Sequence, residues 1–132
     1  MTALENVALP MTFQGYSEEE RRKRARELLE LVELGDRLNH RPTEMSGGQQ
    51  QRVAIARSLA NNPEVILADE PTGNLDSSTG SSVMEFLKKL NKNEGKTIVM
   101  VTHDPTLAKH AKRAVYLKDG KIIDSKKGGN EK

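Results

Sequence analysis

Apolar residues recur with helical spacing in three stretches of this chain. The first stretch follows a Ser17-x-x-Glu20 pattern, which is typical of a capping box at a helix start. Its apolar residues lie at i, i+3, i+4 and i+7, as expected of an amphipathic helix, and Gly35 is placed to end that helix. The side chains that we expect on its buried face are Ala25, Leu28, Leu29 and Val32.

Two further helices are predicted by the same spacing. One begins at Ser46 or Gly47 and ends near residue 60, and the other follows Asp76 as its cap and ends at Gly95. Their expected buried positions are Val53, Ala56, Leu59 and Ala60 in the first, and Val83, Phe86, Leu87 and Leu90 in the second.

Shorter apolar runs have the length of strands. Residues 65–68 and 98–101 are continuous apolar runs, which we interpret as buried strands of a parallel sheet. Residues 114–117 and 121–123 flank Asp119-Gly120, a hairpin signal. Residues 2–9 could form a short helix or an extended arm, and Asp104-Pro105 is expected to open a short helix that reaches residue 110.

The order of these elements predicts an α/β protein with mostly parallel strand pairing. We expect residues 1–62 to be mostly helical, residues 63–124 to form an α/β core, and the polar tail 125–132 to be disordered. With 132 residues, the chain is one domain or a piece of one.

Composition excludes several classes of protein. Lys and Arg total 21 and Asp and Glu total 19, so the net charge of +2 gives no reason to expect a nucleic-acid partner. The chain has no cysteine, which rules out disulfides and thiolate metal sites. No apolar run approaches the ~20 residues that span a bilayer. We therefore expect a cytoplasmic location.

Candidate chemistry begins at the start of the second helix. Ser46-Gly47-Gly48-Gln49 leaves backbone N–H groups uncovered at the positive end of a helix dipole, which is suited to binding an anion. A helix simply capped by Ser46 is the plainer alternative. The longer pattern, which continues as Gln-Gln-Arg, is harder to explain by capping alone.

Carboxylates end the first predicted strand. Asp69 and Glu70 follow it directly, at the strand end where α/β sheets bind ligands. Asp69 is suited to Mg²⁺, and Glu70 to deprotonating an attacking water. His103 follows the second strand at the same edge and could contact a phosphate oxygen, although it could also cap the next helix.

Taken together, these motifs resemble the C-terminal portion of an ATP-binding-cassette (ABC) nucleotide-binding domain. Ser46 to Gln49 is similar to the family signature, residues 65–70 to its Walker B strand, residues 73–76 to its D-loop, and His103 to its switch histidine. The resemblance is greatest to the branch that serves lipoprotein release, macrolide export and cell division. It implies a partial P-loop NTPase core with a helical subdomain.

The same resemblance implies a set of ligands and partners. Glu70 and His103 would be catalytic, Asp69 would hold Mg²⁺, and ATP would contact Ser46, Gly47, Gly48, Gln49 and Asp76. A second nucleotide-binding domain would join head to tail, and a transmembrane permease would hold the protein at the inner face of the membrane.

The chain contains no G-x-x-x-x-G-K-[ST] phosphate loop. By resemblance, the phosphate loop, its strand and the N-terminal β-subdomain would precede Met1. We therefore expect the chain alone to be inactive and able to self-associate. A non-catalytic interaction module and a non-transport cassette ATPase are the alternatives to a transporter ATPase.

Overall fold

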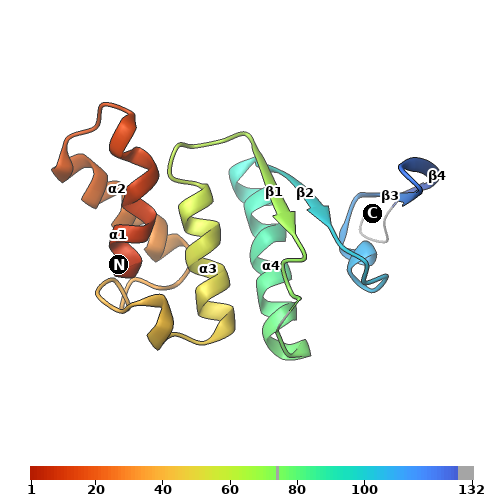
Figure 1. Ribbon diagram of the computed structural model, residues 1–132, viewed down its shortest axis with the longest axis horizontal. Helices are drawn as coiled ribbons and strands as arrows, with labels where there is room; N and C mark the ends of the chain where they lie inside the picture. The colour runs from red at the N-terminus through yellow and green to blue at the C-terminus, as the bar shows by residue number, and fades with distance from the viewer. Residues whose placement is uncertain (74, 128–132) are drawn as a thin grey trace.

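The computed structural model describes residues 1–73 and 75–127. Figure 1 shows the helices α1 to α3 at one end, α4 with β1 and β2 in the middle, and a hairpin of β3 and β4 at the other end. The α-helices are α1 (Ala3–Ala8), α2 (Glu18–Leu31), α3 (Gly47–Ser58) and α4 (Ser77–Glu94). The 3-10 helices are η1 (Leu9–Phe13), η2 (Pro42–Glu44) and η3 (Leu107–His110). The strands are β1 (Val65–Asp69), β2 (Thr97–Val101), β3 (Arg113–Lys118) and β4 (Lys121–Lys127).

The helices begin where side chains can cap them. Ser17 and Ser46 each accept a hydrogen bond from the backbone N–H three residues on, and the Glu20 and Gln49 side chains accept one from the backbone N–H of the cap residue. A third such box at Thr2 makes the N-terminal segment a helix rather than an extended arm. These reciprocal caps satisfy N–H groups that the helix itself cannot pair.

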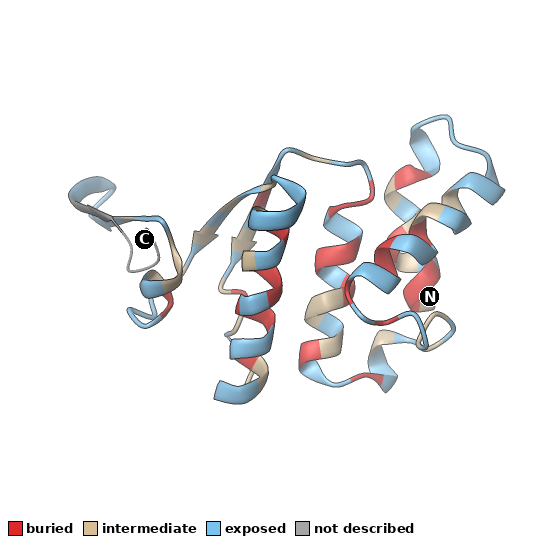
Figure 2. Ribbon diagram, turned by 180° about the vertical axis from the view of Figure 1, so that it is seen from behind, coloured by how far each residue is buried: buried red, intermediate tan, exposed pale blue. Residues whose placement is uncertain are grey.

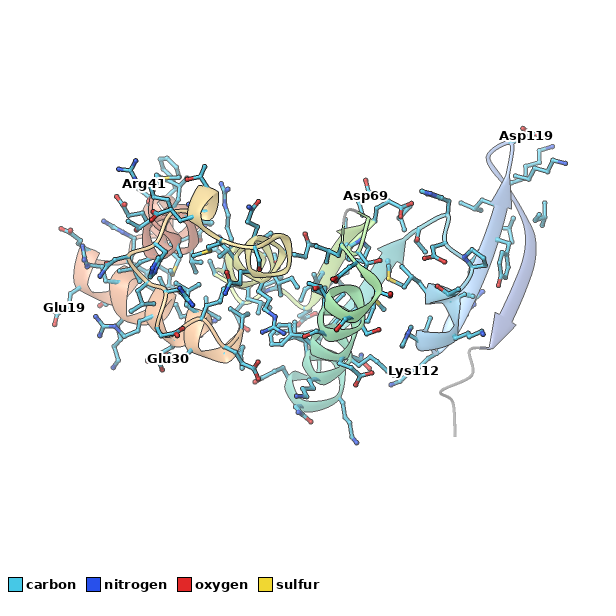
Figure 3. The ribbon with its side chains drawn as sticks, turned by 90° about the horizontal axis from the view of Figure 1, so that it is seen from below. Glu19, Glu30, Arg41, Asp69, Lys112 and Asp119 are labelled. Atoms are coloured by element: carbon cyan, nitrogen blue, oxygen red, sulfur yellow. The ribbon has the colours of Figure 1, made fainter. Side chains whose placement is uncertain are left out.

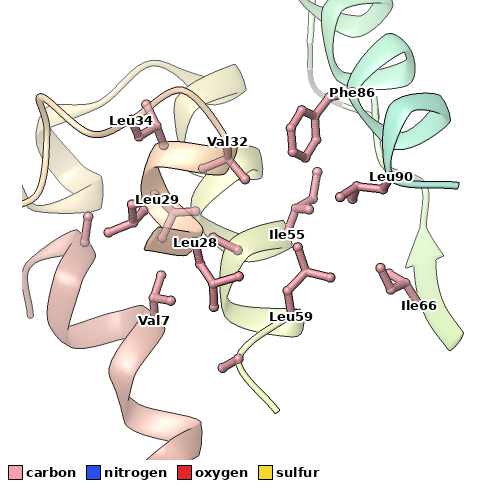
Figure 4. Close-up of a cluster of buried hydrophobic side chains, with 14 of the residues drawn as sticks. Val7, Leu28, Leu29, Val32, Leu34, Ile55, Leu59, Ile66, Phe86 and Leu90 are labelled. Carbon is pink, nitrogen blue, oxygen red and sulfur yellow. The ribbon is translucent and has the colours of Figure 1, made fainter. Parts of the chain in front are cut away.

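One apolar core joins the four α-helices to β1. Figure 4 shows Val7 of α1, Leu29 of α2 and Leu59, the C-cap of α3, in one cluster with Leu90 of α4 and Ile66 of β1. Every side chain predicted to lie on a buried helix face is buried. Figure 2 shows these buried residues along the facing sides of the helices.

The end of α2 differs from the prediction. The helix ends at Leu31, and Glu33 rather than Gly35 adopts the left-handed conformation, with φ of 65°. The backbone N–H groups of Glu33 and Leu34 donate to the carbonyls of Glu30 and Leu29, so the reversal occurs within these residues. Gly95 does end α4 as expected, with φ of 66°.

The strands form two separate two-stranded sheets among the described residues. β1 pairs with β2 in parallel, with Leu67 opposite Val99 and Asp69 opposite Val101. β3 pairs with β4 in an antiparallel hairpin, as predicted. The helix α4 connects β1 to β2, so the central part of the fold is a β-α-β unit.

The prediction that β1 and β2 are buried strands is wrong for one face. Ile66 is buried, and its register partner Ile98 packs against the core. On the other face Leu67 is 78% exposed and Val99 45% exposed, and their strand neighbours Val65 and Val101 are exposed as well. Within residues 1–73 and 75–127, helices pack on only one side of this sheet, so its second apolar face is uncovered by these residues. We call this uncovered set, Val65, Leu67, Val99 and Val101, the outer sheet face.

Two further expectations need correction. Asp104-Pro105 leads into a 3-10 helix that starts at Leu107, because the Asp104 carboxylate accepts hydrogen bonds from the backbone and hydroxyl of Thr106 and forms a turn there. The tail expected to be disordered from residue 125 instead continues β4 to Lys127, and residues 128–132 lie outside the described part of the chain. No helix in the described ranges is long and apolar enough to cross a membrane.

Candidate functional site

The carboxyl ends of β1 and β2 lie side by side, so the residues that follow each strand meet. The Glu70 N–H donates to the Val101 carbonyl at 2.8 Å, which continues the ladder by one bond. Glu70 then turns with φ of 48°, a left-handed conformation uncommon for a residue other than glycine. This turn aims its side chain at the residues after β2.

Three donors from that segment hold the Glu70 carboxylate. Oε1 accepts the His103 N–H at 2.9 Å and lies 2.5 Å from His103 Nδ1, and Oε2 accepts the Thr102 hydroxyl at 3.0 Å. A carboxylate can only accept, so the His103 proton in this contact sits on Nδ1. Glu70 and His103, predicted as catalytic residues, are therefore in direct contact.

These contacts determine the charge of Glu70. Partial desolvation raises the pKa of Glu70, but the hydrogen bonds from the His103 backbone, the Thr102 hydroxyl and the imidazole together lower it more. The net result is a pKa below the ordinary value, so Glu70 is ionised at neutral pH. The lone pairs that it does not give to these donors can accept a further proton donor, such as water.

Thr102 is part of this site and was not predicted from the sequence. Its Oγ1 accepts the Asp104 N–H at 3.0 Å, which leaves its single proton for Glu70. The signal that could have found it is its position, directly before His103 at the end of an apolar strand.

The start of α3 is a capped helix end with backbone donors left over. Ser46 Oγ accepts the Gln49 N–H at 3.2 Å, and Gln49 Oε1 accepts the Ser46 N–H at 3.0 Å. The N–H groups of Gly47 and Gly48 have no acceptor within the helix. The plainer alternative of a Ser-capped helix is thus realised, and it still leaves the Ser46 hydroxyl proton and the N–H of the exposed Gly47 for an anion.

The start of α4 lies against the start of α3. Asp76 caps α4 by accepting the Thr79 N–H at 2.8 Å, and the hydrogen bonds from Thr79 lower the pKa of Asp76. A Cβ atom added to Gly47 or Gly48 would lie within 3 Å of the side chain of Leu75 or Thr79, respectively. In the structure, Asp76 therefore serves α4 as its cap, close to the predicted anion-binding residues.

Asp69 lies at the end of β1 with an exposed side chain, as Figure 3 shows. Among the described residues, no cluster of three or more acidic, histidine or cysteine side chains could hold a metal alone. This arrangement fits Mg²⁺, which often takes one or two carboxylates and fills its remaining positions with water and substrate phosphates. The predicted residues thus form two groups. One is Asp69, Glu70 and His103 at the strand ends, and the other is at the helix starts capped by Ser46 and Asp76. In the sequence, residues 70–76 join the first group to the second.

Comparison with known proteins gives consistent results. A family model described as ABC transporter matches residues 1–73. The chain is 60% identical to the ABC transporter ATP-binding protein MJ0796 of Methanocaldococcus jannaschii over 92% of this chain and 54% of the relative. It is 54% identical to the macrolide export ATP-binding/permease protein MacB 1/2 of Paracoccus denitrificans, over 98% of this chain and 19% of that protein.

Solved structures agree with the sequence relatives. The dimeric MJ0796 cassette in a post-hydrolysis state bound to ADP and Pi superposes with a TM-score of 0.80 and 56% identity, over 96% of this chain and 56% of that one. The chain thus spans about half the length of MJ0796, the relative with which it shares 60% identity.

Proposed function

The chain belongs to the ABC transporter family of ATP-binding proteins, and from this membership we propose that it supplies one share of a site for ATP hydrolysis. The observation that carries the proposal is the ionised Glu70 held by Thr102 and His103 at the carboxyl edge of β1 and β2. A fixed carboxylate with lone pairs to spare is the group that a general base requires.

In the proposed reaction, a water oxygen attacks the γ-phosphorus of ATP and gives its proton to Glu70. The bond between the γ-phosphorus and the bridging oxygen breaks, and ADP departs with that oxygen. The backbone N–H of His103 fixes the orientation of Glu70, and its Nδ1–H adds a second donor to the same oxygen. To donate to a phosphate from Nε2 at the same time, the imidazole ring has to carry its second proton.

Asp69 is the residue that we propose for Mg²⁺, which would neutralise charge on the β- and γ-phosphate oxygens when bound. Ser46, Gly47, Gly48 and Gln49 would contact the nucleotide through the hydroxyl and the open helix end. We propose that Asp76 supports these nucleotide contacts indirectly, because it caps α4 next to the start of α3.

The proposed partners follow from the relatives. MJ0796 forms a dimer, so a second ATP-binding subunit is the expected partner across the nucleotide. MacB is an ATP-binding/permease protein, which favours a membrane permease as the second partner and a place at the cytoplasmic face of the membrane. Nucleic acid is not an expected partner, because the net charge is only +2.

A fusion tests this function. The part of MJ0796 that precedes its matched segment is joined to this chain, and phosphate release is measured with Mg²⁺ and ATP. Glu70→Gln is expected to keep nucleotide binding and reduce hydrolysis by ~10²-fold or more. Ser46→Arg should instead block dimer closure. Hydrolysis within about threefold of the parent fusion after Glu70→Gln would contradict the role of Glu70 as general base.

A non-catalytic interaction module is the second candidate for the 132-residue chain itself. It is favoured by one observation, the lack of a G-x-x-x-x-G-K-[ST] loop in the sequence. A fusion that folds and binds ATP but never hydrolyses it would favour this second function.

A further inference from the structure

Gly48 is a glycine for a reason internal to the fold. It is buried, and a Cβ atom added to it would lie 2.3 Å from Cγ2 of Thr79 in α4. The methyl group of Thr79 therefore occupies the space that a side chain at Gly48 would need. A threonine in a helix has only two common χ1 rotamers, so this methyl has few alternative positions.

Gly47 offers a contrast one residue earlier. A Cβ atom added there would lie 2.9 Å from Cδ2 of Leu75, which is the tip of a flexible side chain, and Gly47 is exposed. An alanine could be accommodated at this position by a small rotation of Leu75. Of the two glycines, Gly48 is therefore the one at which a side chain is sterically excluded.

The first turn of α4 is also packed tightly on a second side. Gly80 is buried, and a Cβ atom added to it would lie 3.3 Å from Cβ of Thr72. Thr72 belongs to the loop that follows Glu70, and in this loop the Gly73 N–H donates to the Glu70 carbonyl at 3.0 Å. A continuous series of close contacts therefore runs from Gly48 through the first turn of α4 to the Glu70 loop.

The position of Thr79 is fixed independently of α3. Its N–H donates to Oδ1 of Asp76 at 2.8 Å, which holds the first turn of α4 in place. The methyl group therefore acts as a stop against which the start of α3 rests.

We propose that Thr79 is a positioning residue whose methyl group sets the separation between the start of α3 and the first turn of α4, and through Gly80 and Thr72 the position of the Glu70 loop. The consequence for ATP hydrolysis rests on the proposed function, because it joins the helix end assigned to the nucleotide with the carboxylate assigned to water. The steric relationship itself does not depend on any ligand.

The test is a double-mutant cycle on the 132-residue chain with Gly48→Ala and Thr79→Ser, and with Gly47→Ala as the matched control. Thr79→Ser removes only the methyl group and keeps the hydroxyl and the capping N–H. Thermal unfolding midpoints report the packing, and the amide chemical shift of Gly73 reports the position of the Glu70 loop. Gly47 and Gly48 are the first two residues of α3, where the gain in helix propensity from alanine is smaller than the ~1 kcal/mol of a helix interior, and it has the opposite sign to the steric conflict.

We expect Gly48→Ala alone to lower the midpoint by about 5 °C or more and to shift the Gly73 amide resonance. In the Thr79→Ser background, the same substitution should leave the midpoint unchanged or raise it, and the resonance should return. Gly47→Ala should leave both readouts nearly unchanged. If Gly48→Ala does not fold alone but folds together with Thr79→Ser, the rescue is equally demonstrated.

Equal losses from Gly48→Ala in both backgrounds would overturn the proposal, as would a double variant that does not fold. A Gly73 resonance that is unmoved by a destabilising Gly48→Ala would overturn the link to the Glu70 loop. None of these measurements involves ATP, so an inactive fusion would contradict the proposed function and leave this result untouched.

Discussion

Nδ1 of His103 lies 2.5 Å from Oε1 of Glu70, and the backbone N–H of the same histidine donates to that oxygen at 2.9 Å. One residue thus supplies two of the three donors to the carboxylate. The backbone donor is fixed by β2, whereas the side-chain donor is exposed and can turn away. Glu70 should therefore keep its orientation when the imidazole is removed but lose it when the segment after β2 moves.

We predict that the 132-residue chain alone does not hydrolyse ATP at a rate typical of enzymes. It has no phosphate-loop lysine and no glycine-rich loop to stabilise charge on the transferred phosphoryl group. Steady-state phosphate release with Mg²⁺ and ATP is the measurement. Turnover near ~1 per second that Glu70→Gln abolishes would refute the prediction.

Thr102→Val should raise the pKa of Glu70, because the substitution removes one of the hydrogen bonds that lower it. Thr102→Ser keeps the hydroxyl and is the matched control. Carbon-13 NMR of the Glu70 carboxyl group during a pH titration measures the shift. In the fusion with MJ0796, Thr102→Val should also reduce hydrolysis by about tenfold, because the carboxylate loses a hydrogen bond that fixes its orientation. The same pKa in both variants would show that Thr102 does not hold the carboxylate.

Acid should destabilise the fold. Hydrogen bonds lower the pKa of Glu70, Asp76 and Asp104 in the folded chain. A carboxylate with a lowered folded pKa stabilises the protein fully above its unfolded pKa, and this stability is lost as the pH falls through the folded value. The urea concentration at the unfolding midpoint should therefore decrease as the pH is lowered below the ordinary pKa values of 4.5 for Glu and 3.8 for Asp. Glu70→Gln should reduce that dependence, and an unchanged pH profile would count against the hydrogen bonds.

The 132-residue chain is expected to self-associate through the outer sheet face. Leu67 and Val99 are register partners on that face and both are exposed, and uncovered apolar strands recruit other chains. Light scattering at micromolar concentration should give a mass above that of a monomer. Leu67→Lys should restore the monomer, whereas Phe13→Lys, at an exposed residue of η1, should not.

Hydrogen exchange at Val99 and Val115 gives an independent check on this association. β3 pairs with β4 and not with β2 among the described residues, so neither Val99 nor Val115 has a backbone partner in the other sheet. A monodisperse monomer with both amides strongly protected would contradict association.

Leu29→Ala should cost about 2–5 kcal/mol of unfolding free energy, because Leu29 is completely buried and its removal leaves a cavity. Leu31→Ala in the same helix is the matched control, since Leu31 is 39% exposed and should cost less than about 1 kcal/mol. Urea unfolding of both variants gives the comparison. Equal losses would indicate that α2 does not pack as described.

The spacing of apolar residues predicted the buried helix faces correctly, because residues three and four positions apart lie on the same side of a helix. It could not tell that only one face of β1 and β2 is covered, since the covering elements are not encoded in the strands themselves. Leu67 has the same apolar character as Ile66 but lies on the uncovered side. Gly35 was a reasonable expectation for the end of α2, yet the local hydrogen bonds placed the reversal at Glu33.

The candidate site was predictable where the residue type reveals the chemistry. Glu70 and His103 were assigned from their places after two strands, and the structure places them in contact. Thr102 and Thr79 were missed because a threonine hydroxyl or methyl group acquires a role only through a neighbour distant in the sequence. Their partners, Glu70 and Gly48, became apparent only once β1, β2, α3 and α4 had been arranged in space.

The parallel pairing of β1 with β2 also constrains the order in which the chain can fold. In the sequence, β1 precedes and β2 follows the 18-residue helix α4. Their ladder can therefore form only after the ends of this whole intervening segment have come together. Early formation of α4 shortens that segment and reduces the entropy lost on closure. Substitutions that weaken the Asp76 cap should therefore slow refolding, and those confined to the β1–β2 ladder should mainly speed unfolding.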